Sequence, residues 1–203
     1  MERKNMPNVI LHKKLEKRKK LLDSSYELFV EKGISNVSIA EICQKAGIAK
    51  GTFYLYFTSK EDIARALNRR ISFTLMQKAY DEVNRNRKDT FADNVITMAN
   101  FIIDYFHADT ETLKMMRKDF IFPLTVDDFD NSTNPLMISL RQEISGYASV
   151  SGYSNHEILF RLYSLLSMIA GICHSVIIDH FPDTDIDDLK PVLFDMIRKA
   201  IQP

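Results

Sequence analysis

Aromatic rings and lysines are crowded into residues 50–60, KGTFYLYFTSK. Phe53, Tyr54, Tyr56 and Phe57 supply the rings, and a lysine stands at each end of the stretch. A lysine ammonium binds anions such as phosphate, and a tyrosine hydroxyl can donate a hydrogen bond to the same oxygens. A buried core uses rings but has no need of the lysines, so this combination favours recognition of a polyanion.

The charge of the chain is divided along its length. The 203 residues hold 27 Lys and Arg and 27 Asp and Glu, and residues 1–70 hold 15 of the basic and 8 of the acidic ones. The first part is therefore +7 (15 − 8), and the remainder is −7 (12 − 19). This asymmetry indicates a polyanion-binding segment joined to a different part, although a solvated basic helix accounts for the charge equally well.

The run KKLEKRKK, residues 13–20, concentrates this positive charge. It fits an arm that reaches the minor groove of DNA, a solvated helix start, or a segment that attracts phosphates without sequence preference. We favour the last interpretation, because it needs no precise geometry.

Helical spacing of apolar residues recurs over nearly the whole chain, which predicts an all-α fold. We expect helices over residues 13–32, 39–45, 50–56, 59–84, 90–107, 110–122, 134–149, 155–179 and 187–201. Gly33 and Gly47 suit the left-handed positions that end helices, and Ser38 and Ser59 begin S-x-x-E and S-x-x-D capping patterns. Residues 84–89 are an expected linker, and residues 125–135 an expected loop. We divide the chain into domains at residues 1–66 and 67–203.

The two short helices joined by Ala46-Gly47-Ile48 have the spacing of a helix-turn-helix motif. In that motif the second helix enters the major groove of DNA. Phe53 and Phe57, four residues apart, suit its packed face, whereas Tyr54 and Tyr56 lie off that face and are available to phosphate or to a thymine methyl group. Gly51 has no side chain, so the backbone can come close to DNA.

Residues 38–63, SIAEICQKAGIAKGTFYLYFTSKEDI, resemble the DNA-binding domain of the TetR (tetracycline repressor) family of bacterial transcription regulators. That family has a capped T/S-x-x-x-I-A helix, an A-G-V/I turn, K-G/P-T-x-Y-x-H/Y-F, and K-E/D at the start of a fourth helix. The resemblance implies a three-helix DNA-binding domain followed by a helical ligand-binding and dimerisation domain. It implies DNA contacts by Ser38, Lys50, Gly51, Thr52, Tyr54, Tyr56 and Lys60. Ala49 departs from the pattern, because the family often has Ser or Thr there as a helix cap.

Small residues follow one stripe of the helix predicted at 155–179, where they let two helices approach closely. The resemblance implies a homodimer through the last two helices, and a dimer is what a helix-turn-helix protein needs to read a palindromic operator. We expect the interface to contain Leu159, Leu166, Ser167, Ile169, Gly171, Ser175, Leu189, Leu193, Met196 and Ile197. The alternative is that this stripe packs inside one subunit.

The middle helices are rich in methionine and aromatic residues, and the resemblance implies a pocket there for a small-molecule effector. Methionine-rich linings adapt to varied ligands, although such a stripe is more often plain core. The predicted lining is Asn100, Phe101, Tyr105, Arg117, Phe120, Tyr147, Arg161, Tyr163 and His174. Arg117 and Arg161 would suit an anionic ligand.

The remaining patterns mainly exclude functions. Cys43 and Cys173 form no C-x-x-C pair, the N-terminus has no signal-peptide core, and the apolar stretch 162–173 is short of the roughly 20 residues that span a bilayer. We found no G-x-S-x-G, Walker A, G-x-G-x-x-G or H-E-x-x-H motif, and the five histidines show no metal-ligand spacing.

We therefore expect a cytoplasmic, homodimeric, DNA-binding transcription regulator. We expect no enzyme activity, cofactor, metal or membrane partner. The regulator is expected to be a repressor that a small molecule releases from its operator. One alternative is a regulator without a ligand that is switched by a protein partner or by redox state. The other is a helical enzyme or carrier that happens to contain a basic hairpin.

Overall fold

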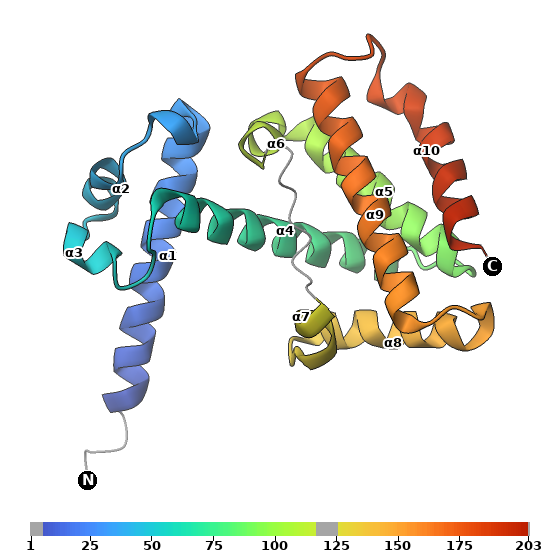
Figure 1. Cartoon of the computed structure of the whole chain (residues 1–203), viewed down its shortest axis with the longest axis horizontal. Helices are drawn as coiled ribbons and strands as arrows, with labels where there is room; N and C mark the ends of the chain where they lie inside the picture. Colours follow the sequence, from blue (N-terminus) through green and yellow to red (C-terminus); the bar gives the residue numbers. More distant parts are fainter. Residues whose placement is uncertain (1–5, 117–125, 203) are drawn as a thin grey trace. The chain divides into compact units, whose positions relative to one another are not determined.

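The computed structural model describes residues 6–116 and 126–202, which are mostly helical and contain no strand (Figure 1). The all-α prediction is confirmed. The chain divides into two compact units, residues 1–68 and 69–203, and passes from one to the other inside α4. The sequence places the division after residue 66.

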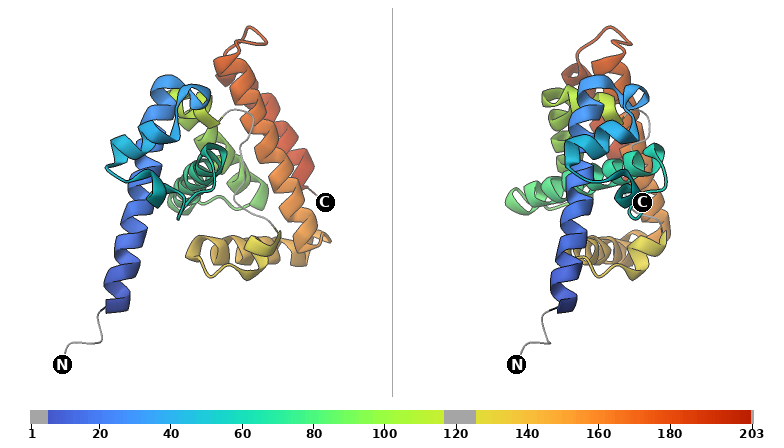
Figure 2. Two further views of the ribbon diagram at one scale, coloured as in Figure 1. Left: turned by 60° about the vertical axis from the view of Figure 1, so that its left-hand side comes forward. Right: turned by 90° about the vertical axis from the view of Figure 1, so that its left-hand side faces the viewer.

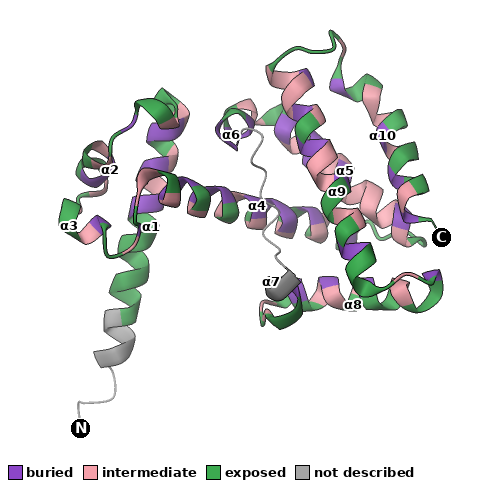
Figure 3. Cartoon of the chain, viewed as in Figure 1, coloured by how far each residue is buried: buried purple, intermediate pink, exposed green. Residues whose placement is uncertain are grey.

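The first unit contains α1 (Met6–Lys32), the 3-10 turn η1 (Ile34–Asn36), α2 (Ile39–Ala46), α3 (Lys50–Phe53) and the start of α4 (Lys60–Arg85). α2 packs on α1, and α3 packs on α2. Their apolar faces form a core that contains Leu21, Leu22, Phe29, Ile42, Phe53, Phe57, Ile63 and Leu67. α1 begins earlier than predicted, and its residues 11–20 are all exposed, so burial within residues 11–32 is confined to positions after 20 (Figure 3).

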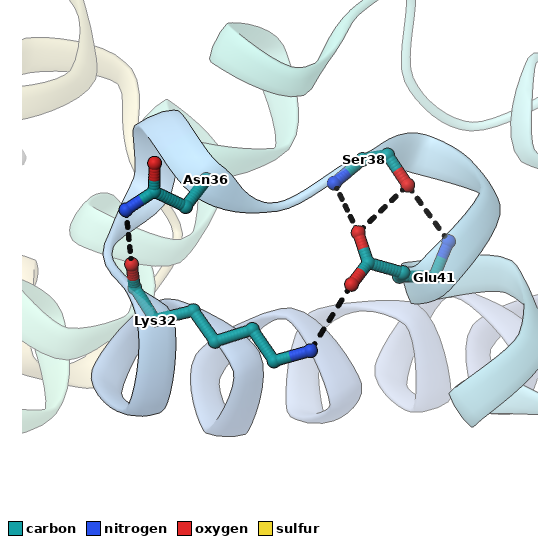
Figure 4. Close-up of polar contacts among 4 residues, drawn as sticks. All are labelled: Lys32, Asn36, Ser38 and Glu41. Atoms are coloured by element: carbon teal, nitrogen blue, oxygen red, sulfur yellow. Dashed lines mark hydrogen bonds and ion pairs between the residues drawn. The ribbon is translucent and has the colours of Figure 1, made fainter.

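The predicted capping box at the start of α2 is confirmed. The Ser38 hydroxyl accepts from the Glu41 amide at 3.2 Å, and the Glu41 carboxylate accepts from the Ser38 amide at 2.8 Å (Figure 4). Lys32 at the end of α1 donates to the other Glu41 oxygen at 3.1 Å. These hydrogen bonds, led by the one from the Ser38 amide, lower the pKa of Glu41 to about 2. Gly47 closes α2 at φ 64°, a left-handed conformation that glycine adopts without strain.

The start of α4 is capped from two residues. The Ser59 hydroxyl accepts from the Asp62 amide at 3.1 Å, as the S-x-x-D pattern predicts. The Asp62 carboxylate then accepts from the Thr58 amide at 2.8 Å, one residue before the position that a capping box would use. The first turn of α4 is thus held by local hydrogen bonds.

The second unit contains the rest of α4, α5 (Phe91–Ala108), α6 (Thr110–Met116), α7 (Val126–Asn131), α8 (Pro135–Ser151), α9 (Asn155–Cys173), the π-helical turn η2 (His174–Ile178) and α10 (Ile186–Ile201). α5, α9 and α10 pack side by side in pairs, and α8 packs on α9 (Figures 1 and 2). Ile102, Ile103, Phe106, Ile169 and Ile197 are among the buried residues at these contacts.

The loop predicted at residues 125–135 is wrong over its first half, where α7 forms. Arg141 of α8 donates hydrogen bonds to the carbonyl oxygens of Phe129, Asp130 and Ser132. These are the carbonyls that a helix end leaves without an intrahelical partner. The cap therefore comes from another helix, which local sequence patterns do not reveal.

The helical run Asn155–Ile178 is only partly buried. By length and composition alone it could cross a membrane. Within its most apolar 18 residues, 28% are buried inside the chain. Phe160 and Tyr163 of α9 are 57% and 46% exposed. The prediction that residues 162–173 form a buried helix therefore holds for one face only, and the other face is apolar surface.

Candidate DNA-binding surface and ligand cavity

The aromatic stretch of the first unit divides between core and surface, as its spacing predicts. Phe53 and Phe57 are 0% and 3% exposed, with ring centroids 5.8 Å apart. Tyr54 is 51% exposed and meets Phe53 edge to face at 5.5 Å. Burial of the phenylalanines holds the backbone, and the neighbouring phenol is left facing solvent.

α3 is shorter than the predicted helix 50–56, because the chain turns after Phe53. The amide of Tyr56 donates to the carbonyl oxygen of Phe53 at 2.9 Å, which keeps this segment compact. Lys50 and Gly51 are exposed, whereas Thr52 and Tyr56 are half-buried. A Cβ added at Gly51 would meet no heavy atom within 4 Å, so packing within the chain does not require glycine here.

Leu55 is a surface residue that the sequence patterns did not single out. It is 75% exposed and stands between the two tyrosines. An exposed aliphatic group in a major-groove segment can contact the methyl group of thymine. The only available signal was its position between two candidate contacts, because leucine itself is read as core by default.

Two further predicted DNA-contact residues, Ser38 and Lys60, already have structural roles, and Ala49 lacks the cap that the family pattern has at its position. Ser38 is occupied by its capping box. The Lys60 ammonium donates to the carbonyl oxygen of Ser35 at 3.0 Å, which joins the start of α4 to η1. Ala49 occupies the N-cap of α3 with no side-chain hydrogen bond, as its departure from the family pattern implies.

The exposed part of α1 presents mostly positive charge. Residues 13–20 carry six basic side chains and one acidic side chain, and all are exposed. Arg18 lies over the Phe57 ring, 5.4 Å from its centroid, and links this segment to the core of the first unit. Lys19 pairs with Asp23 at 2.9 Å. A basic helix of this kind attracts a phosphate backbone without reading its sequence.

The second unit encloses an apolar cavity of about 60 Å³ between α4, α5, α8 and α9. Its lining includes Met76, Val83, Val95, Met98, Phe129, Leu140, Ile144, Leu162 and Leu166. Tyr80, Asn94 and Glu143 add the polar atoms. An engineered cavity of about 150 Å³ binds benzene, so a ligand of useful size must displace side chains here. Methionines adapt most readily to such a change.

None of the predicted pocket residues that the structure describes is found lining this cavity. Asn100 bonds Asp104 on the surface of α5, Tyr105 bonds Asp109, and His174 bonds Asp179. Phe101 is half-buried and Tyr163 is exposed. Arg117 and Phe120 lie outside the described residues. The cavity uses the first half of α5, because that is the part of α5 that faces α4 and α8.

A polar hollow of about 340 Å³ adjoins the cavity and shares Phe91, Asn94 and Glu143 with it. Tyr147, a predicted pocket residue, lines this hollow, stacks on Phe91 with ring centroids 4.3 Å apart and donates to the Ile201 carbonyl oxygen. Burial raises the pKa of Tyr147. Arg87 contributes a guanidinium that bonds Glu143 at 2.5 Å, and this bond raises the pKa of Arg87.

Arg161, another predicted pocket residue, lines an open hollow on α9 instead. This hollow is also lined by Phe160, Ser164 and Met168. The Arg161 guanidinium stacks over the Tyr153 ring at 4.1 Å and donates to the Ala200 carbonyl oxygen, so it ties α9 to the end of α10.

The predicted dimer residues fall into two groups. The first group is buried within the chain and contains Leu159, Ile169, Leu193 and Ile197. The half-buried Leu166 belongs with it, because it lines the cavity together with Leu159 and Ile169. Met196 is 45% exposed, Gly171 is exposed, and Ser167, Ser175 and Leu189 are half-buried. Two exposed apolar residues on the same helices, Phe160 and Val192, are not among the predicted interface residues. Helical spacing identified the helices but not which face of each is covered.

Two further groups have chemistry to consider. Cys43 and Cys173 are free and buried, and burial raises both thiol pKa values, that of Cys173 to about 12. His107, Asp185 and Asp187 offer ligand atoms within 4.8 Å of one another, a proximity that their sequence spacing concealed. All three are exposed, Asp185 caps α10, and Asp187 pairs with Lys190 at 2.6 Å. Capping and ion pairing account for this cluster.

Comparison with known proteins identifies relatives of both the first unit and the whole fold. Residues 21–67 match the family model of bacterial regulatory proteins of the tetR family. The chain is 20% identical over 191 residues to the HTH-type transcriptional regulator YvdT of Bacillus subtilis, covering 91% of this chain and 95% of that protein. It is 37% identical over 57 residues to the fatty acid metabolism regulator protein of B. subtilis, covering 28% of this chain and 29% of that protein.

Solved structures share the fold at low sequence identity. A TetR family transcription regulator from Marinobacter aquaeolei matches with a TM-score of 0.58 at 15% identity, over 93% of this chain and 97% of that one. The regulator FadR from B. subtilis, solved in complex with stearoyl-CoA, matches with a TM-score of 0.53 at 16% identity, over 89% and 97%.

Proposed function

The chain belongs to the TetR family of bacterial transcriptional regulators, and from this premise we propose that it is a cytoplasmic homodimeric repressor released from a palindromic operator by a small apolar effector. The observation that carries the proposal is the division of residues 50–60 between buried core and exposed surface. Phe53 and Phe57 fix this segment in the core, while Lys50, Gly51 and Tyr54 are exposed beside them. This is the arrangement that a segment entering the major groove requires.

DNA contact by the segment is supported by its chemistry. Lys50 and the Tyr54 hydroxyl can reach phosphate oxygens, and the open space around Gly51 lets the backbone approach. Leu55 adds an exposed aliphatic group for a thymine methyl. Lys60 would contact a phosphate with the N–H donors that remain after its hydrogen bond to the Ser35 carbonyl oxygen. The Ser38 hydroxyl and amide both donate to Glu41, so Ser38 would contact a phosphate by exchanging its hydroxyl hydrogen bond. The basic residues of α1 would add affinity that does not depend on sequence.

Dimerisation is supported by the uncovered apolar face of α9 and α10. Phe160, Tyr163, Val192 and Met196 are between 45% and 58% exposed. Exposed apolar area of this kind marks an interaction site in soluble proteins. A second copy of the same face would cover it, and the two-fold symmetry would match a palindromic operator.

Effector binding is supported by the apolar cavity of the second unit. The B. subtilis regulator FadR has been solved with stearoyl-CoA, a ligand with a long apolar chain. In this chain Met76, Tyr80 and Val83 of α4 line the cavity, and Lys60 opens the same helix. A ligand that displaces these side chains would act on α4 and favour a conformation that fits the operator less well. The ligand must bind the two conformations with different affinity.

The alternatives have less support. A redox switch needs a reactive thiolate, and burial raises the pKa of both Cys43 and Cys173. The similar proteins named above are transcription regulators, which favours regulation over an enzyme or carrier role.

The experiment that tests the proposal is selection of bound sequences from random duplex DNA at a fixed salt near physiological strength. We expect enrichment of a palindrome whose two half-sites are about 10 base pairs, or a multiple, apart. Failure to enrich any sequence, both alone and with hydrophobic small molecules added, would contradict it.

A further inference from the structure

The apolar cavity of the second unit has one charged group in its wall. Of the lining residues in the described part of the chain, Glu143 of α8 alone carries a charge, and Tyr80 and Asn94 are the other polar members. The Glu143 side chain is 30% exposed. The electrostatic character of the cavity is therefore set by a single carboxylate at its edge with the polar hollow.

This carboxylate has a partner that a ligand can replace. Arg87 bonds Glu143 at 2.5 Å and lies in the connection between α4 and α5, where its side chain is 49% exposed. Arg87 lines the polar hollow but is not found in the cavity wall. A guanidinium that is half in water loses little when it is released to solvent, whereas a partly buried carboxylate needs a replacement cation.

Aromatic faces lie beside the same carboxylate. Phe91 lines both spaces and stacks on Tyr147 with an interplanar angle of 9°. Aromatic ring faces attract cations, and quaternary ammonium groups in particular. An anionic head group would meet the Glu143 carboxylate at this point. Asp89 and Glu143 balance Arg87 and Lys88 in the hollow, and displacement of Arg87 leaves an excess of negative charge, which favours a cation.

We propose that the effector is an organic cation with an apolar tail, bound with its tail in the cavity and its charged head against Glu143 in place of Arg87. This inference rests on the proposed effector role of the cavity, and it adds the sign of the ligand's charge. Entry of the cation breaks the ion pair between Arg87 and Glu143, so binding also removes one of the contacts that hold the connection that follows α4.

Three probes share a six-carbon chain and differ in the charge of the head group: hexyltrimethylammonium, hexanoate and 1-hexanol. They separate the effect of the charge on binding from the effect of the apolar tail. Binding of each to the full-length protein would be measured by isothermal titration calorimetry. We expect the cation to bind roughly tenfold more tightly than hexanoate, from its charge pair and its contact with aromatic faces. Glu143→Gln should remove most of this preference.

Two variants control for indirect effects. Arg87→Gln should strengthen cation binding, because it removes the competing guanidinium. Glu111→Gln breaks the exposed ion pair with Lys114 on α6 and should leave the binding of all three probes unchanged. Circular dichroism would confirm that each variant is folded.

The outcomes distinguish this inference from the proposed function. If hexanol binds and the cation binds no better, or if hexanoate binds best, the cavity remains a ligand site and the inference about charge is overturned. If none of the three probes binds, the effector site and the inference are both wrong. A cation preference that survives Glu143→Gln would also overturn the inference.

Discussion

Single residues in the first unit show how one segment can serve both the fold and DNA. Gly51 is exposed with no neighbour to fill the space around its Cα, whereas Gly47 takes the left-handed φ of 64° that ends α2. A methyl group at Gly51 therefore costs the fold nothing through packing, and a requirement for glycine there must come from an approaching partner.

Gly51→Ala is expected to weaken operator binding without destabilising the protein. Alanine is favoured over glycine in a helix by about 1 kcal/mol, so the free energy of unfolding should stay the same or rise. The added methyl group should obstruct backbone approach to DNA and lower operator affinity roughly tenfold, about 1.4 kcal/mol. Urea unfolding and operator titration would measure the two effects. Unchanged operator affinity would show that the backbone does not approach DNA at Gly51.

The lowered pKa of Glu41 predicts how the stability of the protein depends on pH. Its pKa is about 2 in the folded chain against an ordinary value of 4.5, mainly because it accepts hydrogen bonds from Ser38. Between these values the unfolded chain takes up the proton and the folded chain does not, so stability falls as the pH falls. The contribution of Glu41 to the free energy of unfolding is complete above pH 4.5, and it is lost as the pH falls from 4.5 to about 2.

Glu41→Gln should therefore make the acid limb of the stability curve shallower than in the unmodified protein. Denaturant midpoints at a series of pH values between about 5 and 2 would measure this. Glu157 forms the same capping box with Ser154 in the second unit, and its pKa is also lowered, so Glu157→Gln provides a matched comparison. An acid limb of unaltered slope in Glu41→Gln would contradict the role of the capping box.

At the level of helices, the sequence predicts features that depend on neighbouring residues and misses features that depend on residues distant in the sequence. The capping box of Ser38 with Glu41, the Ser59 cap, the Gly47 turn and the burial of Phe53 and Phe57 follow from spacing alone. α7 was missed because Arg141 of another helix caps it. The residues predicted to line a pocket differ from those that line the apolar cavity, because the cavity depends on which faces of α4, α5, α8 and α9 meet, and periodicity does not specify that pairing.

The exposed basic part of α1 should act on any DNA sequence. Changing Lys13, Lys14 and Lys17 together to glutamine would remove three charges from an exposed segment. For every phosphate that is no longer neutralised, the slope of log affinity against log salt concentration should become shallower by about 0.9. We expect operator and random duplex to lose affinity by similar factors, measured by fluorescence anisotropy at several salt concentrations. A weakening confined to the operator would mean that α1 reads sequence.

At the level of the whole molecule, the uncovered apolar face of α9 and α10 must be accounted for. Phe160→Glu or Met196→Glu would place a charge in the proposed dimer interface, where burial without a partner is costly. Each variant should shift sedimentation from dimer to monomer and weaken operator binding. Val150→Glu, at a position 79% exposed on α8, is the matched control and should remain dimeric. A dimer that persists in both interface variants would place the interface elsewhere.

The measurement that tests the account most directly is the ratio of dissociation constants for the selected operator and for a scrambled duplex, at one salt concentration near physiological strength. Specific binders prefer their site by about 10³-fold or more, and we predict a ratio in that range for the unmodified protein. Tyr54→Ala should reduce the ratio toward one while leaving the helical content and the dimer intact, because Tyr54 is 51% exposed. A ratio near one for the unmodified protein, or an unchanged ratio for Tyr54→Ala, would contradict the assignment of residues 50–60 as the segment that reads DNA.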